Sequence, residues 1–97
     1  MALVAEATYR YQNIASATTT VVKTTPGQLR RLVINKPVAS TTITIYDNTA
    51  ASGTKIATIA TPATLLDAQI QLDYGVNFAT GLTIVTSGAD DINVVYL

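Results

Sequence analysis

The side chains best placed for chemistry in this sequence are two adjacent aspartates, Asp90 and Asp91, in the segment SGADD. Paired carboxylates can bind Ca²⁺, but that ion takes roughly 6–8 oxygen ligands, and the surrounding sequence has no D-x-D pattern or distant glutamate to complete the set. Gly88 and the aspartates are typical turn formers. We interpret SGADD as a hairpin turn between the last two strands, with solvent-facing carboxylates that alanine could replace without loss of folding; a bound cation is the alternative.

Other candidates for catalysis are few. Asp67 and Asp73 are a possible carboxylate pair of the kind that hydrolyses glycosides, although a solvated face is the simpler interpretation. The chain contains no His and no Cys, so it lacks a Ser-His-Asp triad, a thiol nucleophile and the commonest zinc ligands. We expect a protein without enzymatic activity, bound metal or cofactor.

Charged residues are sparse, and the basic and acidic ones balance in number. Six basic and six acidic residues give a net charge of zero, and charged residues make up 12% of the sequence, about half the usual share. Without a dense basic face, nucleic acid is not an expected partner. No stretch approaches the roughly 18 apolar residues of a membrane span, and the N-terminus lacks the basic region of a secretory signal. We expect a protein that is made in a cytoplasm, binds no membrane and is held in an assembly.

The composition favours β-structure. Threonine occurs 17 times, and with Val, Ile and Tyr it dominates segments in which apolar and polar residues alternate. The clearest strand is residues 41–46, and the loop DNTAASG joins it to residues 54–60 in a predicted hairpin. Turn signals recur about every 8–12 residues, as in two-layered β-proteins.

These signals predict an all-β fold, a single antiparallel β-sandwich of seven to eight short strands over residues 16–97. Both the immunoglobulin-like and the jelly-roll arrangement fit the spacing. Residues 1–15 are predicted to form an N-terminal arm or an edge strand. Pro62 can open a helix, so a short helical turn over residues 62–68 is the alternative to an irregular crossover.

Four residues are candidates for contact with a partner: Tyr9, Arg10, Tyr11 and Tyr46. Tyr9 and Tyr11 share one face of the N-terminal segment, where their rings and hydroxyls suit docking on a partner. An edge strand that packs on its own domain is the alternative. Tyr46 lies on the threonine side of its strand and is expected to be exposed.

Two segments carry a family resemblance. TITIYDNTAASGTKIATI (residues 42–59) and GLTIVTSGADDINVVYL (residues 81–97), joined by a stretch with the pattern D-Y-G-V-x-F (residues 73–78), resemble small proteins encoded in the structural gene clusters of tailed bacteriophages. The similarity covers about residues 29–97, and residues 1–28 lie outside it.

The resemblance implies a virion protein without enzymatic activity, either a capsid decoration (cement) protein or a head-tail component. Together with the sparse charge, it leads us to expect a cyclic homo-oligomer, with a trimer favoured, that binds the major capsid protein on the capsid surface. The alternatives are a head-tail or tail component and a carbohydrate- or host-binding module of a tail or fibre.

Overall fold

The computed structural model describes residues 8–64 and 69–97, which form eight strands and no helix. The prediction of an all-β fold with seven to eight strands is confirmed. The strands are β1 (Arg10–Ile14), β2 (Thr18–Lys23), β3 (Gly27–Lys36), β4 (Thr42–Tyr46), β5 (Lys55–Ala60), β6 (Ile70–Phe78), β7 (Leu82–Thr86) and β8 (Asp91–Tyr96).

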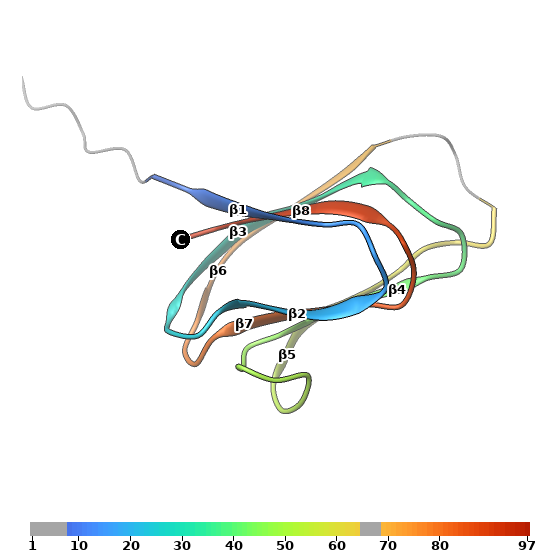
Figure 1. The fold of residues 1–97 in the computed structure, drawn as a ribbon. Coiled ribbons are helices and arrows are strands. Elements are labelled where there is room, and N and C mark those ends of the chain that lie inside the picture. The colour runs from blue at the N-terminus through green and yellow to red at the C-terminus, as the bar shows by residue number, and fades with distance from the viewer. Residues whose placement is uncertain (1–7, 65–68) are drawn as a thin grey trace, which may run out of the picture.

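The strands form two antiparallel sheets that lie face to face (Figure 1). Sheet A has the strand order β1-β8-β3-β6, and sheet B has the order β2-β7-β4-β5. Successive strands alternate between the sheets except at β4 and β5, which form the predicted hairpin. This order is that of a jelly roll, so the strand pairing decides between the two arrangements that the sequence left open.

The core lies between the sheets and is built from alternate residues of the strands. Because successive side chains of a strand point to opposite faces, one apolar set per strand is buried. Each buried aliphatic or aromatic side chain contributes about 1.5–3 kcal/mol. The core residues are Ile14, Leu29, Leu32, Ile34, Ile43, Ile45, Phe78, Leu82, Ile84, Ile92 and Val94.

Strand β1 is an edge strand of sheet A. It pairs with β8 from Arg10 opposite Tyr96 to Ile14 opposite Ile92. Ile14 is buried in the core, so β1 is anchored at one end by its own side chain. Of the segment 1–15, residues 1–7 lie outside the described residues.

The last two strands do not form a hairpin. β7 belongs to sheet B and β8 to sheet A, so residues 87–90 cross from one sheet to the other. The crossover carries Asp90 into the interior, where its side chain is fully buried. The expectation of a solvent-facing carboxylate is therefore wrong for Asp90, because alternation within each strand does not reveal that the chain changes sheet between them.

Asp90 links the crossover between β7 and β8 to the crossover between β3 and β4. Its Oδ2 accepts hydrogen bonds from the main-chain N–H of Val38 (3.1 Å) and from the hydroxyl of Thr41 (2.9 Å). The main-chain N–H of Thr41 in turn donates to the hydroxyl oxygen of Thr61 (2.7 Å). Asp90 is thus a structural residue that joins the two crossovers at one end of the sandwich.

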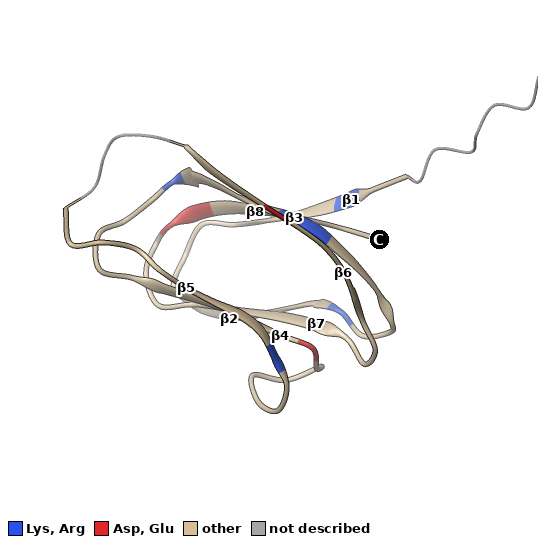
Figure 2. Cartoon of the chain, turned by 180° about the vertical axis from the view of Figure 1, so that it is seen from behind, with Lys and Arg blue, Asp and Glu red and all other residues tan. Residues whose placement is uncertain are grey.

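The predicted helical turn over residues 62–68 falls partly on residues 65–68, which lie outside the described residues. Residues 62–64 are not helical. Across residues 8–64 and 69–97, no helix has the length and apolar character needed to cross a membrane. Figure 2 shows charged segments scattered thinly over both sheets.

Candidate docking surface

The most exposed aromatic side chains lie at the β1 edge. Tyr11 is 71% exposed and Tyr9, just before the strand, is 42% exposed. Arg10 lies between them and is also exposed. We call Tyr9, Arg10 and Tyr11 the tyrosine edge. Three of the four residues predicted to contact a partner thus lie next to one another at the start of the open edge strand β1.

A bulge in β3 places two arginines on the outer face of sheet A. Leu29 and Leu32 are both buried, and the pairing register of β3 shifts between Leu29 and Arg31 against both neighbouring strands. Because a bulge adds a residue between two inward positions, Arg30 and Arg31 both fall on the outer side. Simple alternation places only Arg31 there, so Arg30 is added by the bulge, and neither arginine was among the residues predicted to contact a partner.

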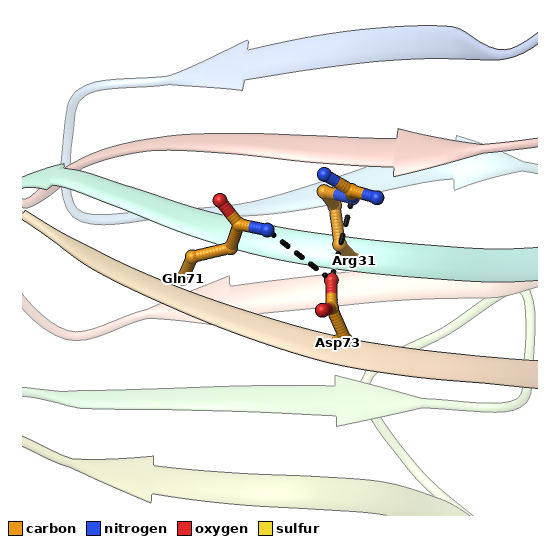
Figure 3. Close-up of polar contacts among 3 residues, drawn as sticks. All are labelled: Arg31, Gln71 and Asp73. Atoms are coloured by element: carbon orange, nitrogen blue, oxygen red, sulfur yellow. Dashed lines mark hydrogen bonds and ion pairs between the residues drawn. The ribbon is translucent and has the colours of Figure 1, made fainter.

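One row of paired residues crosses the whole outer face of sheet A. Tyr11 lies opposite Val95, Val95 opposite Arg31, and Arg31 opposite Asp73. Arg31 Nε lies 3.4 Å from Asp73 Oδ1, which also accepts a hydrogen bond from Gln71 Nε2 at 3.4 Å (Figure 3). A pair this exposed contributes about 0–1 kcal/mol, so its carboxylate and guanidinium remain available to a partner.

Amide side chains cover the rest of this face. Asn13 Nδ2 donates to Asp91 Oδ1 (2.7 Å) and to Asn93 Oδ1 (2.8 Å), which fastens β1 to β8. Asn35 Nδ2 reaches the same Asp91 oxygen (3.4 Å), and Gln69 Nε2 donates to Asn35 Oδ1 (3.1 Å). We call these five residues the amide network. Asp91 serves there as a hydrogen-bond acceptor that orders the face.

Tyr46 lies apart from the tyrosine edge. It belongs to β4 in sheet B, the opposite layer, and is half-buried rather than exposed. Lys55 Nζ lies 5.9 Å from the centroid of the Tyr46 ring, a cation–π contact worth about 0.5–1 kcal/mol at an exposed site. The four predicted contact residues therefore occupy two separate surfaces.

The outer face of sheet B has a different character. Its central row runs from Thr19 through Val85 and Thr44 to Thr58. None of these four side chains carries a charge or an aromatic ring. Because Tyr and Arg are the residues most enriched at the energetic centres of protein interfaces, sheet A is the better candidate for a docking surface.

The described residues hold no cluster suited to metal binding. No three of their Asp, Glu, His or Cys side chains come close enough to hold a metal ion. Asp67, half of the glycosidase-like pair, lies outside the described residues, and Asp73 faces Arg31. A shallow depression of about 560 Å³ lies beside Phe78 and Leu97. Lys23 lines it, but its Nζ donates to the main-chain oxygens of Pro26 and Leu97.

Asp47 is a structural carboxylate at the start of the β4–β5 loop. It accepts hydrogen bonds from the main-chain N–H groups of Ala79 and Thr80, both at 2.9 Å. These donors hold the pKa of Asp47 below its ordinary value of 3.8, because they stabilise the ionised form. Asp47 thereby fixes the turn before β7.

The lowered pKa of Asp47 predicts a pH dependence of stability. Because the pKa is lower in the folded than in the unfolded chain, the ionised carboxylate stabilises the fold above about pH 4, and this contribution disappears as the pH falls through the folded-state pKa. Asp47→Asn is expected to melt at a lower temperature than the wild type at neutral pH and to approach it toward about pH 2. Melting curves by circular dichroism check this; an equal difference at both pH values would contradict it.

The tyrosine edge and the row from Tyr11 to Asp73 together form the candidate docking surface. It combines exposed Tyr rings, two Arg side chains and an ordered amide network on one sheet. Comparison with known proteins finds no matching family model, no matching curated sequence and no matching solved structure.

Proposed function

We propose that this chain is a non-enzymatic structural protein of a tailed-bacteriophage virion, a capsid decoration protein that binds the major capsid protein on the capsid surface. The observation that carries the proposal is the gathering of Tyr9, Tyr11, Arg30 and Arg31 on one sheet of an otherwise weakly charged jelly roll. The resemblance of residues 42–59 and 81–97 to tailed-phage structural proteins supports the virion assignment.

The proposed mechanism is stabilisation by mass action. A protein that binds the assembled shell and not the dispersed subunits shifts the equilibrium toward the shell. A cyclic homo-oligomer, with a trimer favoured, presents several copies of the docking surface at once. Linked copies bind far more tightly than single ones, because the second contact is intramolecular.

The roles of the described carboxylates support a protein without catalysis. Asp47 accepts main-chain N–H groups, Asp73 faces Arg31, Asp90 joins two crossovers, and Asp91 belongs to the amide network. A general acid or base has to reach a substrate proton from an accessible position. Each of these four carboxylates instead has a structural partner in its own chain.

A carbohydrate-binding module of a tail or fibre is the second candidate, and the amide network favours it. Asn13 on β1 and its partner Asn93 on β8 present amide groups on the same face as the exposed Tyr11 ring, and sugar hydroxyls pair well with amides. Binding of the chain to glycans, together with failure to sediment with capsids, would favour this candidate over decoration.

Sedimentation with capsid shells tests the decoration proposal. The shells are assembled from the major capsid protein encoded in the same structural gene cluster, and the chain is titrated onto them. We expect the wild-type chain to co-sediment with the shells. The dissociation constant of Tyr11→Ala is expected to be at least about tenfold higher, because truncation of an interface tyrosine costs about 1.4 kcal/mol or more.

Tyr46→Ala is the matched control for that experiment. It removes the same ring from the opposite sheet, so its affinity is expected to stay within about twofold of wild type. Loss of binding by Tyr46→Ala alone would move the docking surface to sheet B. Absence of wild-type binding to shells at any concentration would overturn the decoration proposal itself.

A further inference from the structure

Strand β1 gains little burial on either side of sheet A. Because Ile14 points into the core, alternation places Gln12 and Arg10 on the same inner side of the sheet. Both side chains are nevertheless exposed, so sheet B does not cover this part of β1. Tyr11 and Asn13 are exposed on the outer side as well. Of the five residues of β1, only Ile14 is buried.

The side chains that fasten β1 lie at its C-terminal end. Asn13 Nδ2 donates to Asp91 Oδ1 (2.7 Å), to Asn93 Oδ1 (2.8 Å) and to the main-chain oxygen of Ile92 (3.0 Å). The next residue, Ile14, lies opposite Ile92 and enters the core. Two adjacent residues therefore provide the side-chain anchor of the strand, and release of this anchor frees all of β1.

The connection from β1 to β2 is held by sheet B. Three residues, 15–17, join the two strands. The hydroxyl of Thr86, a buried residue of β7, donates to the main-chain oxygen of Ser16 at 2.6 Å and accepts a hydrogen bond from the N–H of Thr18 at 3.2 Å. From Thr18 onward, β2 is paired with β7. Because these contacts belong to sheet B, β1 can leave sheet A while β2 stays in place.

The other strands keep an extensive core without β1. Among the described residues, Ile14 is the one member of the buried core that β1 supplies. Without β1, sheet A retains β8, β3 and β6, and sheet B retains all four of its strands. Three or more strands with an apolar face can form a stable sheet. Loss of the contacts of β1 therefore does not require loss of the fold.

We propose that β1 is a detachable strap, in which residues 8–14 open away from β8 about a hinge at residues 15–17 while the other strands stay folded. Local opening of this kind takes less free energy than global unfolding. The closed strap aligns Tyr11 with Val95 and Arg31, and the open strap removes the tyrosine edge from this row. The candidate docking surface is thus complete only when the strap is closed. The inference concerns the isolated chain and does not rest on capsid binding.

Amide hydrogen exchange of the full chain, followed by NMR, tests the strap. The β1 amides that bond to β8 are expected to be at least about tenfold less protected than the β3 amides that bond to β8. Strand β8 provides a second readout, because its N–H groups face β1 and β3 in alternation. Those that face β1 are expected to exchange at the rate of β1, and those that face β3 are expected to stay as protected as β3.

Ile14→Val and Ile45→Val are a matched pair of variants for this experiment. Both shorten an isoleucine that is buried in the core, and so small a change leaves the chain folded. Ile14→Val weakens the anchor of β1, so the β1 amides are expected to lose protection by about two- to tenfold. Ile45 belongs to β4, which pairs with β5 and β7. Ile45→Val is therefore expected to lower protection in β3 and β4 and to leave β1 unchanged.

The same measurements can overturn the proposal. β1 amides that are as protected as those of β3, or that lose as much protection as β3 in Ile45→Val, would show that β1 opens only with the whole fold. Exchange that is fast at Arg10 and Tyr11 but unchanged by Ile14→Val would show fraying of the strand end instead of opening of the strap. Equal protection of all β8 amides would also contradict it.

Discussion

Asp90→Ala is expected to lower the free energy of unfolding by about 3 kcal/mol. The substitution leaves the buried Val38 N–H without its acceptor, which costs about 1–3 kcal/mol, and removes one of the acceptors of the Thr41 hydroxyl, which keeps Val38 O (3.1 Å) and Thr61 Oγ1 (3.0 Å) within reach. For a domain of this size, such a loss lowers the melting temperature by roughly 12–24 °C. Because domains are stable by only about 5–15 kcal/mol, the effect is a large share of the total.

The loop that Asp90 holds adds to this expectation. Ser40 has a positive φ of 57°, a conformation that a residue with a side chain adopts at an energetic cost. Ser40 lies between Val38 and Thr41, the two residues that Asp90 contacts. Without those hydrogen bonds the loop can relax out of this conformation, and the crossover from β3 to β4 loses its fixed path.

Asp90→Asn is the informative comparison. Oδ2 takes both hydrogen bonds, whereas Oδ1 has no partner among the described residues. An asparagine can place its oxygen at the Oδ2 position and keep both donors satisfied, so we expect a loss of about 1 kcal/mol or less. Urea unfolding followed by circular dichroism measures both variants. Equal losses for Ala and Asn would show that the carboxylate charge, and not its acceptor geometry, stabilises the fold.

Phe78→Ala is expected to cost about 3–5 kcal/mol, the range for removing a buried aromatic ring. Phe78 is the largest fully buried side chain in the described part of the chain. It ends β6 opposite Gly27, where an added Cβ would come within 2.8 Å of the ring atom Cζ. A ring fitted this closely leaves a cavity when it is removed, because its backbone neighbours cannot collapse onto the space.

Tyr11→Ala is the matched control for Phe78→Ala. It deletes an aromatic ring from another strand of sheet A, but one that is mostly exposed, so its unfolding free energy should change by about 0.5 kcal/mol or less. The same variant is expected to bind capsid shells more weakly. A variant that stays stable but binds weakly separates the effect on stability from the effect on function. A Phe78→Ala protein as stable as Tyr11→Ala would contradict the assignment of Phe78 to the core.

The sequence predicted the elements of this fold better than their connections. Alternation around Ile43 and Ile45 identified a strand, and the turn-rich loop after it identified a hairpin, because both signals are local. The crossover at Asp90 was not predicted, because a turn within one sheet and a crossover between two sheets contain the same types of residue. Burial of Asp90 depends on contacts with Val38 and Thr41, about 50 positions away in the sequence.

The candidate site was also predicted only in part, because local signals reveal some of its residues and long-range pairing determines the others. Tyr9 and Tyr11 were singled out by their type and spacing, and the structure places them at an open edge. Arg30 required knowledge of a bulge, which is set by pairing with β8 and β6. The amide network combines residues from three strands with Gln69, which lies just before β6. The spacing by two of Asn93 and Asp91, or of Gln69 and Gln71, was nevertheless a signal for a polar outer face.

The central position of β8 in sheet A has a consequence for synthesis of the chain. β8 separates β1 from β3, so the first strand has no partner within sheet A until residues 91–96 have left the ribosome. Sheet B, by contrast, already contains the β4–β5 hairpin, which is local and can form early. The jelly roll is therefore completed only when β8 is available, and the emerging chain carries an unpaired β1 until then.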